Sequence, residues 1–167
     1  MSSKFFNKKY FLYLILIIFF ISKIIILWSK NYVLWDSSVY IGMGKFIFTF
    51  GNSGIWESSR PIIFPFFLGL LNQTFNSIYI LRLFELGLTL IYGYIVYLIG
   101  KEILDEEVGI ISVLILLTIP TIFNFSGMLL SEIMSSVFIL LAVYLLFKKR
   151  FFWSGIFGGI GFLTRFL

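Results

Sequence analysis

Few side chains in this sequence can carry ionic or acid–base chemistry, and the most suggestive of them come in short clusters. Asp36 follows Trp35 and stands four residues before Tyr40, so Asp36 and Tyr40 share one face if the segment is helical. A carboxylate at a boundary between water and lipid can act as a general base. The alternative is that Asp36 caps a helix, because an Asp followed by two serines also suits a helix start.

A second cluster combines an acid, two hydroxyls and an arginine directly before an apolar segment. It reads Glu57-Ser58-Ser59-Arg60-Pro61. An arginine beside a helix N-terminus suits a phosphate group, because the guanidinium and the free backbone N–H groups both attract an anion. The alternative is plain capping, with Pro61 at the first helical position and the serines as caps.

Further ionisable side chains stand within apolar segments, where an unpaired charge is costly. Glu132 follows Ser131 near the start of such a segment, so it is either a functional residue or a favourable charge in the first turn of a helix. Arg82 and Glu85 are three residues apart, and we expect them to form an ion pair that fixes helix packing rather than to bind substrate. Arg165 could extend to the membrane surface or meet a phosphate.

The composition places these clusters in a membrane protein. Of the 167 residues, 60% are hydrophobic and 13% are charged, with a mean hydropathy of +1.03, whereas soluble domains have about 25% charged residues. This hydrophobicity excludes intrinsic disorder. With no Cys and no His, disulfides, thiol chemistry, imidazole bases and the usual zinc sites are excluded. The net charge of +5 comes from residues that flank apolar segments, so membrane topology explains it better than nucleic-acid binding.

Five apolar segments predict five transmembrane helices. They cover residues 10–28, 78–100, 108–123, 129–147 and 151–167. The first is too long for the core of a signal peptide, so we expect an uncleaved span with the N-terminus in the cytoplasm. Lys23 within it is expected to extend its amine to the outer interface. Pro120 predicts that the third span kinks or ends early.

Segment 61–75 decides the topology. As a helix it reaches only about 22 Å, which is short of a span. If it does not cross, seven lysines and arginines lie on the cytoplasmic side and three outside, as the positive-inside rule requires. We therefore predict an all-α integral protein of the cell membrane, with an outer loop (residues 29–77) that bears juxtamembrane helices. Asp36, Glu57, Arg60 and Glu132 then lie near the outer surface.

The order of these features resembles the N-terminal part of type C (GT-C) membrane glycosyltransferases. It is similar in particular to the dolichyl-phosphate-mannose–protein mannosyltransferases and the bacterial aminoarabinose transferases of lipid A. The matching motifs are Trp35-Asp36-Ser37-Ser38-Val39-Tyr40, Gly42-Met43-Gly44, Arg60-Pro61-Ile62-Ile63-Phe64-Pro65, Leu130-Ser131-Glu132 and Gly158-Gly159-Ile160-Gly161-Phe162-Leu163-Thr164-Arg165.

This resemblance implies sugar transfer from a polyisoprenyl-phosphate donor to an acceptor on the outer face. Asp36 would be the general base that deprotonates the acceptor hydroxyl, with inversion at the anomeric carbon. Arg60, together with Lys45 or Arg165, would neutralise the leaving phosphate. The substrate-binding residues would be Tyr40, Lys45, Glu57, Arg60, Glu132 and Arg165. Glu57 and Glu132 would position acceptor or sugar; whether they hold a divalent cation is left open.

The sequence departs from that family in length, because GT-C enzymes have many more spans. We therefore expect a truncated enzyme or one half of a split one. Two other functions stay open: a non-catalytic membrane subunit that packs against partner helices, and a small transporter with Arg82 and Glu85 in its pathway. The outer clustering of acids favours the glycosyltransferase over the transporter, since transport sites usually lie near the midplane.

Overall fold

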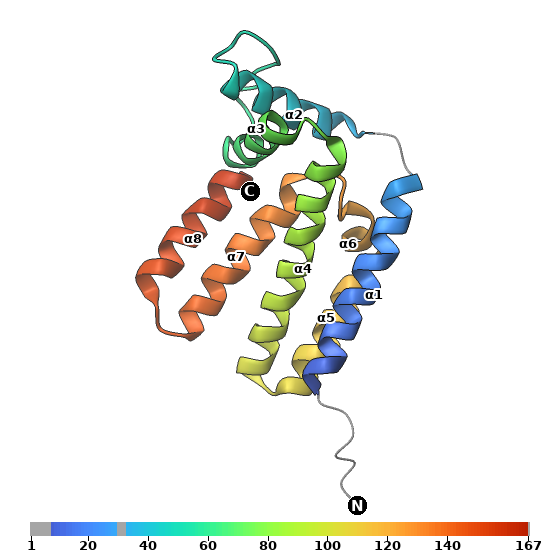
Figure 1. Ribbon diagram of the computed structural model, residues 1–167. Coiled ribbons are helices and arrows are strands. Elements are labelled where there is room, and N and C mark those ends of the chain that lie inside the picture. The colour runs from blue at the N-terminus through green and yellow to red at the C-terminus, as the bar shows by residue number, and fades with distance from the viewer. Residues whose placement is uncertain (1–7, 30–32, 167) are drawn as a thin grey trace, which may run out of the picture.

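The computed structural model describes residues 8–29 and 33–166, and within these residues every regular element is a helix (Figure 1). The prediction of an all-α protein is thereby confirmed. The helices are α1 (Lys8–Ser29), α2 (Trp35–Phe48), α3 (Ile63–Phe75), α4 (Ile78–Ile103), α5 (Glu106–Thr118), α6 (Pro120–Phe125), α7 (Ser131–Phe147) and α8 (Phe151–Thr164). Residues 30–32 of the predicted outer loop and Leu167 of the last predicted span lie outside the described residues.

Helices α1, α4, α5, α7 and α8 form a bundle with α4 at its centre, in contact with α1, α5 and α7. Within the part of the chain that the structure describes, two helices are long and apolar enough to cross a membrane, over residues Lys8–Leu27 and Ile78–Ile103. Helix α4, with 26 residues, reaches about 39 Å, more than the hydrocarbon thickness of about 30 Å. Helices α5, α7 and α8 are shorter, so the count of five spans stays a prediction.

The third predicted span is two helices rather than one. Helix α5 ends at Thr118, and the short α6 begins with Pro120 at its first position. Ile119 between them is extended, with φ −59° and ψ 123°, as expected for a residue before proline. Because proline lacks an N–H and clashes with the preceding turn, it ends α5, and the predicted early end at Pro120 is confirmed.

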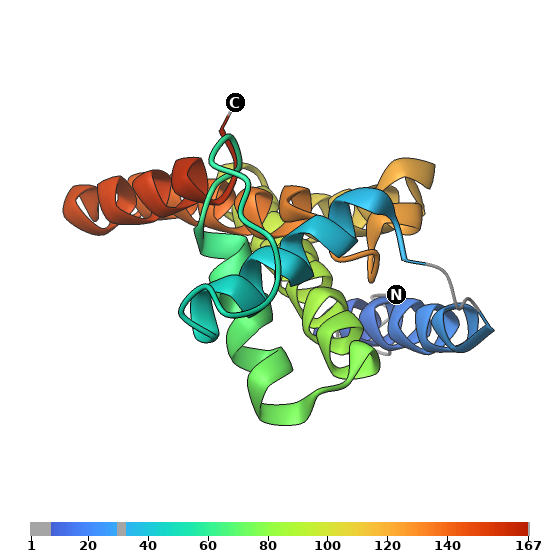
Figure 2. The same cartoon turned by 90° about the horizontal axis from the view of Figure 1, so that it is seen from above.

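Helices α2 and α3 lie across one end of the bundle (Figure 1), and Figure 2 shows α2 crossing above the long helices. We call these two helices and the loop between them (residues 35–75) the ledge. They touch backbone to backbone: a Cβ on Gly44 would lie 2.7 Å from the Gly69 nitrogen, and one on Gly69 would lie 2.6 Å from the Gly44 carbonyl oxygen. The opposite end, which holds the α4–α5 and α7–α8 turns, is the turn end.

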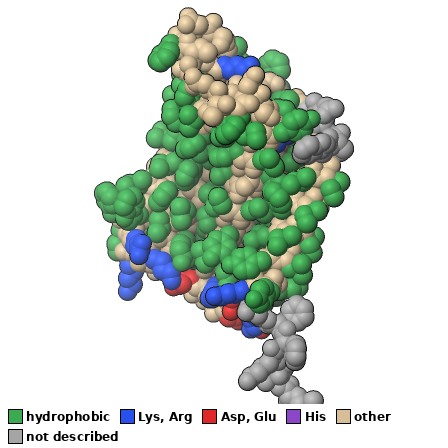
Figure 3. Space-filling model, viewed as in Figure 1, with side chains coloured by type: hydrophobic (Ala, Val, Ile, Leu, Met, Phe, Trp, Pro, Cys, Tyr) green, Lys and Arg blue, Asp and Glu red, His purple; other side chains and the backbone are tan. Residues whose placement is uncertain are grey.

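The ledge is joined to the bundle by a continuous apolar core. Tyr40, Phe64 and Leu68 of the ledge pack in one buried cluster with residues of α4 and α7, among them Leu81 and Ile133. Between the two ends the surface is a broad belt of hydrophobic side chains, and charged side chains gather at the turn end (Figure 3). An exposed apolar area of this extent is characteristic of contact with lipid.

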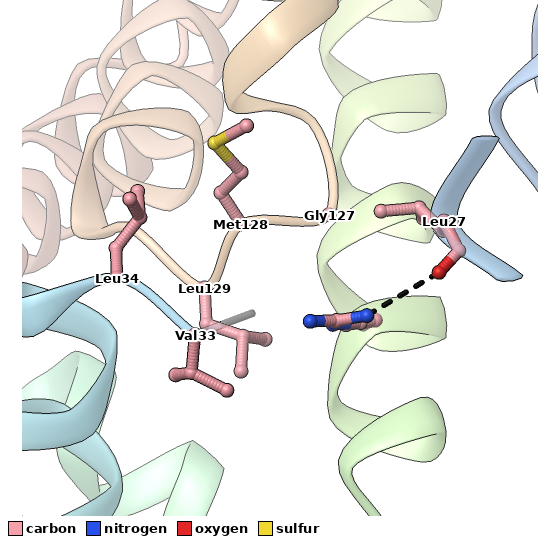
Figure 4. A pocket seen from close by; sticks show the side chains of 7 residues that line it. Leu27, Val33, Leu34, Gly127, Met128 and Leu129 are labelled. Carbon is pink, nitrogen blue, oxygen red and sulfur yellow. Dashed lines mark hydrogen bonds between the residues drawn. The ribbon is translucent and has the colours of Figure 1, made fainter. Parts of the chain in front are cut away.

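Three ionisable side chains are buried among the bundle helices, and the structure corrects both expectations about them. Lys23 is only 2% exposed and donates to the Phe123 carbonyl at 2.6 Å, so it does not extend to the outer interface. Arg82 donates to the Leu27 carbonyl at 3.3 Å, as the dashed line in Figure 4 marks, and the described residues contain no ion pair between Arg82 and Glu85. Glu85 is fully buried. The Leu130 amide lies near its carboxylate, but the two groups do not have the geometry of a hydrogen bond.

Both corrections have one physical reason. Leu27 and Phe123 lie in the last turns of α1 and α6, where backbone carbonyls have no partner within their own helix. These carbonyls attract cations, as the negative end of a helix dipole does. Lys23 and Arg82 therefore satisfy carbonyls of neighbouring segments, which spacing along one helix cannot indicate.

Candidate active site

A polar pocket lies where the ledge meets the bundle. Its walls are formed by Asp36, Tyr40, Ser59, Arg60, Pro61, Leu130, Glu132, Arg165 and Phe166. These residues come from α2, the loop before α3, the start of α7 and the end of α8. A second pocket, lined by Arg82, has mostly apolar walls from the end of α1 and the segments before α2 and α7, such as Leu27, Val33 and Met128 (Figure 4). Among these two, only the pocket at the ledge gathers carboxylates and guanidinium groups.

Helix α2 presents Asp36 and Tyr40 to this pocket, one turn apart as the spacing predicted. Tyr40 is buried, its ring meets Phe64 edge-on at 5.2 Å, and its hydroxyl lies 3.0 Å from the Ser131 hydroxyl. The N-cap of α2 is Leu34, with no capping hydrogen bond from a side chain. The alternative that Asp36 caps the helix is therefore wrong, and its carboxylate is available to the pocket.

Arg60 is the centre of the ionic contacts at the ledge. Its Nη2 donates to Asp36 Oδ1 at 2.7 Å, its Nε lies 3.0 Å from Glu57 Oε2, and its guanidinium lies 5.0 Å from the centre of the Tyr40 ring. Burial of the guanidinium lowers the pKa of Arg60, but the hydrogen bond to Asp36 and the nearby Tyr40 and Glu57 side chains outweigh this effect and raise the pKa above its ordinary value. Arg60 is therefore a permanent cation in the pocket wall.

The cluster before α3 does not cap that helix as the alternative proposed. Helix α3 begins at Ile63, with Ile62 as its N-cap and no capping side chain. Pro61 thus lies outside the helix, and Ser59 donates its hydroxyl to Glu57 Oε1 at 3.1 Å instead. Glu57 is held by two partners, Arg60 and Ser59, although it does not itself line the pocket.

Glu132 and Arg165 form a second ion pair in the wall of the same pocket. The pair joins the first turn of α7 to the end of α8, so both interpretations of Glu132, as a favourable helix-start charge and as a pocket residue, agree with the geometry. One oxygen of Glu132, Oε2, is buried and makes no hydrogen bond among the described residues. Such an orphaned acceptor requires a donor from a ligand or from water.

Like Glu57, the predicted site residue Lys45 does not line the pocket, and unlike Glu57 it forms no ion pair with a residue that does, among the residues that the structure describes. It lies nine residues after Asp36, about two and a half helical turns, and therefore on the opposite face of α2. Conversely, Ser59 and Ser131 were missed as polar neighbours of Glu57 and Tyr40. The only signal for them was their position next to Arg60 and Glu132 in the sequence.

The described residues contain no group of three or more Asp or Glu side chains that could hold a metal ion. Each carboxylate of the pocket wall instead contacts an arginine, Asp36 with Arg60 and Glu132 with Arg165. This arrangement does not fit a divalent cation, because each carboxylate is already neutralised by a guanidinium.

Comparison with known proteins adds to this geometry. The exposed apolar side chains of the bundle and the ionic pocket at one of its ends are typical of a membrane protein. The family model for dolichyl-phosphate-mannose-protein mannosyltransferase matches residues 59–167, which is 109 of the 167 residues, about two thirds of the chain. The chain therefore belongs to the dolichyl-phosphate-mannose-protein mannosyltransferase family, and the resemblance inferred from the motifs is confirmed. No curated protein and no solved structure matches it.

The matched segment contains part of the pocket only. Arg60, Glu132 and Arg165 lie within it, whereas Asp36 and Tyr40 on α2 precede it. The family match therefore covers helices α3 to α8 and the last residues of the loop before α3, and the geometry of the pocket is what links α2 to them.

Proposed function

We propose that this protein transfers a sugar from a polyisoprenyl-phosphate donor to an acceptor hydroxyl at the ledge pocket. The observation that carries this proposal is the convergence of Asp36, Arg60, Glu132 and Arg165 on one pocket from four separate segments. A base, two cations and an orphaned acceptor oxygen are what inverting transfer from a lipid phosphate requires. Membership of the mannosyltransferase family supports the same reaction class.

In the proposed reaction the acceptor oxygen attacks the anomeric carbon of the sugar and transfers its proton to Asp36. The bond between that carbon and the phosphate oxygen breaks, and the phosphate leaves with the electron pair. Arg60 and Arg165 stabilise the negative charge that grows on the leaving phosphate. Glu132 Oε2 accepts a hydrogen bond from a hydroxyl of the sugar or the acceptor.

We further propose a multi-pass arrangement in the cell membrane with the ledge pocket on the extracytoplasmic side. The spans would be α1, α4, α5 with α6, α7 and α8. Charge supports this orientation, because the basic residues of the turn end lie opposite the ledge. They are Lys8, Lys9, Lys101, Lys148, Lys149 and Arg150, and such an excess favours the cytoplasmic side.

The test compares the two aspartates of the chain, Asp36 and Asp105. Sugar transfer from a radiolabelled polyisoprenyl-phosphate sugar would be measured in membranes that contain the native protein. We expect Asp36→Asn to lower the rate about 10²- to 10⁴-fold, the usual contribution of a general base. Asp105→Asn is the matched control, because Asp105 caps α5 at the turn end and Asn is an equally good cap. An unchanged rate of sugar transfer in Asp36→Asn would show that Asp36 is not the general base, and it would favour a non-catalytic subunit.

A further inference from the structure

The structure holds the proposed base in an ion pair with the residue that is proposed to bind the leaving phosphate. Arg60 contacts Asp36 at 2.7 Å and Glu57 at 3.0 Å. Both carboxylates thus bind the cation that a lipid phosphate would need. The significance of this ion pair for catalysis rests on the proposed function, and it concerns the order of events in the pocket.

The two carboxylates differ in how many partners hold them. Among the described residues, Asp36 has a single polar side-chain partner, Arg60. Glu57 has two partners, because the Ser59 hydroxyl donates to its second oxygen at 3.1 Å. The Asp36 side chain is also the more exposed one, at 52% against 42% for Glu57. If a stronger ligand competes for Arg60, Asp36 is the carboxylate that is easier to displace, and water can solvate it.

A phosphate is such a ligand. A guanidinium binds it through two parallel charge-assisted hydrogen bonds, whereas a single bond of this kind joins Arg60 to Asp36. Arg60 also has an unsatisfied donor to offer, since its Nε is buried and lies near Glu57 without hydrogen-bond alignment. A phosphate that enters the pocket brings further negative charge beside Asp36, and the repulsion between them favours separation of Asp36 from Arg60.

We infer that Arg60 is a charge switch: the phosphate of the lipid donor takes the guanidinium from Asp36 and so releases the base only once the donor is bound. Before donor binding, the carboxylate is neutralised and is not free to accept a proton from an acceptor or from water. After donor binding, it faces the pocket without its cation. The donor therefore binds before the acceptor in the productive sequence.

Infrared spectroscopy can observe this release directly, because the chain contains only two aspartates. Protein labelled with carboxyl-¹³C aspartate gives isotope-shifted carboxylate bands for Asp36 and Asp105 alone. Asp105 caps α5 through the Val108 amide at 2.9 Å at the turn end, so it is an internal reference. Difference spectra would be recorded in lipid nanodiscs with polyisoprenyl phosphate, with neutral polyisoprenol and with inorganic phosphate, and binding would be measured separately by native mass spectrometry.

In the wild-type protein, we expect polyisoprenyl phosphate to shift the Asp36 carboxylate band fully to the frequency that this band has in ligand-free Arg60→Gln. In Arg60→Gln itself, polyisoprenyl phosphate should cause no further shift. Neutral polyisoprenol should leave both bands unchanged, and the Asp105 band should not move with any addition. A shift with inorganic phosphate at high concentration also supports the switch, because it shows that the phosphoryl group alone displaces Asp36.

The failures of the two proposals are distinguishable. Binding of polyisoprenyl phosphate to the wild-type protein with an unmoved Asp36 band overturns the switch and leaves the proposed function standing. Absence of binding overturns the donor step of the proposed function, and the switch with it. The wild-type measurement needs no variant, so a folding defect in Arg60→Gln would not decide the result; Arg60→Lys, which retains the charge, should keep the Asp36 band near its wild-type position.

Discussion

The ledge end and the turn end of the bundle both contain ion pairs, but the pairs are built differently. At the turn end, Lys8 contacts Glu107 at 2.6 Å and Lys148 contacts Glu102 at 2.5 Å. Each of these residues has one oppositely charged partner, and all four side chains are more than a third exposed. At the ledge, Arg60 is shared between two carboxylates and its side chain is only 20% exposed.

The two ends also differ in their buried polar atoms that lack a hydrogen bond. Two of the buried polar atoms without a hydrogen bond, Arg60 Nε and Glu132 Oε2, belong to residues that line the ledge pocket. No residue of the turn-end pairs among the described residues has such an atom. Exposed ion pairs whose polar atoms are all satisfied contribute little to stability and mainly reflect membrane topology. Shared charges and buried atoms without a hydrogen bond instead indicate a site that binds a ligand.

The largest effect should distinguish the cations of the two ends. Arg60→Gln removes the proposed phosphate ligand and should lower the rate of sugar transfer about 10²- to 10³-fold, as loss of a transition-state donor typically does. Lys148→Gln removes a cation with a single carboxylate partner at the turn end and should change the rate less than about twofold. Transfer kinetics at saturating donor would measure both. Equal losses in the two variants would contradict the assignment of function to one end.

The second prediction compares two glycines, one at each end, that each pack directly against a backbone carbonyl. A Cβ on Gly69 would lie 2.6 Å from the Gly44 carbonyl oxygen, and one on Gly109 would lie 2.6 Å from the Tyr97 carbonyl oxygen. We expect Gly69→Ala and Gly109→Ala each to destabilise the fold by about 1–3 kcal/mol through overpacking against backbone, as measured by thermal unfolding in detergent. Only Gly69→Ala should also impair transfer at temperatures where both variants are folded, because it displaces Asp36 relative to Arg60.

A smaller effect should appear in donor affinity. Asp36 competes with phosphate for Arg60, so Asp36→Asn should bind polyisoprenyl phosphate about two- to fivefold more tightly than wild type, the factor expected for a half-exposed ion pair. Asp105→Asn should bind it as wild type does. Fluorescence or native mass titration measures both, and weaker binding by Asp36→Asn would argue against the competition.

The smallest effect concerns acid stability at the turn end. A hydrogen bond from the Tyr97 hydroxyl at 2.8 Å, helped by the charge of Lys101, lowers the pKa of Glu106 below its ordinary value of 4.5. A lowered pKa contributes stability that is present above pH 4.5 and is lost as the pH falls through the folded-state pKa. Wild type should therefore lose slightly more stability than Glu106→Gln on acidification from about pH 6 to about pH 3. An equal loss in both would mean that this hydrogen bond contributes nothing measurable.

The helices and the pocket could be predicted from the sequence where they depend on the spacing of residues along one segment. A spacing of four positions puts Asp36 and Tyr40 on one face, and Pro120 ended α5 where proline chemistry requires it. Lys45 could have been excluded from the pocket by the same spacing, because nine residues from Asp36 place it on the other face of α2. The Asp36 ion pair with Arg60 was not predicted, since it depends on how the loop before α3 folds back over α2.

The partners of the buried charged side chains could not be predicted from the sequence, for a different reason. Arg82 and Glu85 are three positions apart, and this spacing favours a pair only when no better partner is near. The open carbonyl ends of neighbouring helices are better partners for Arg82 and Lys23, but their positions depend on how the helices pack. Residue types along one helix contain no information on that packing.

The backbone contact between Gly44 and Gly69 has a mechanical consequence. Two helices that meet without intervening side chains cannot slide or hinge against each other easily, so the ledge moves as one rigid plate. Helix α3 has exposed apolar side chains such as Phe66 and Leu70, which in a membrane would rest on the lipid surface. A change in bilayer thickness or lateral tension that tilts α3 would then tilt α2 by the same angle and move Asp36 against Glu132 and Arg165 on the bundle. The lipid around this protein would thereby set the width of its pocket.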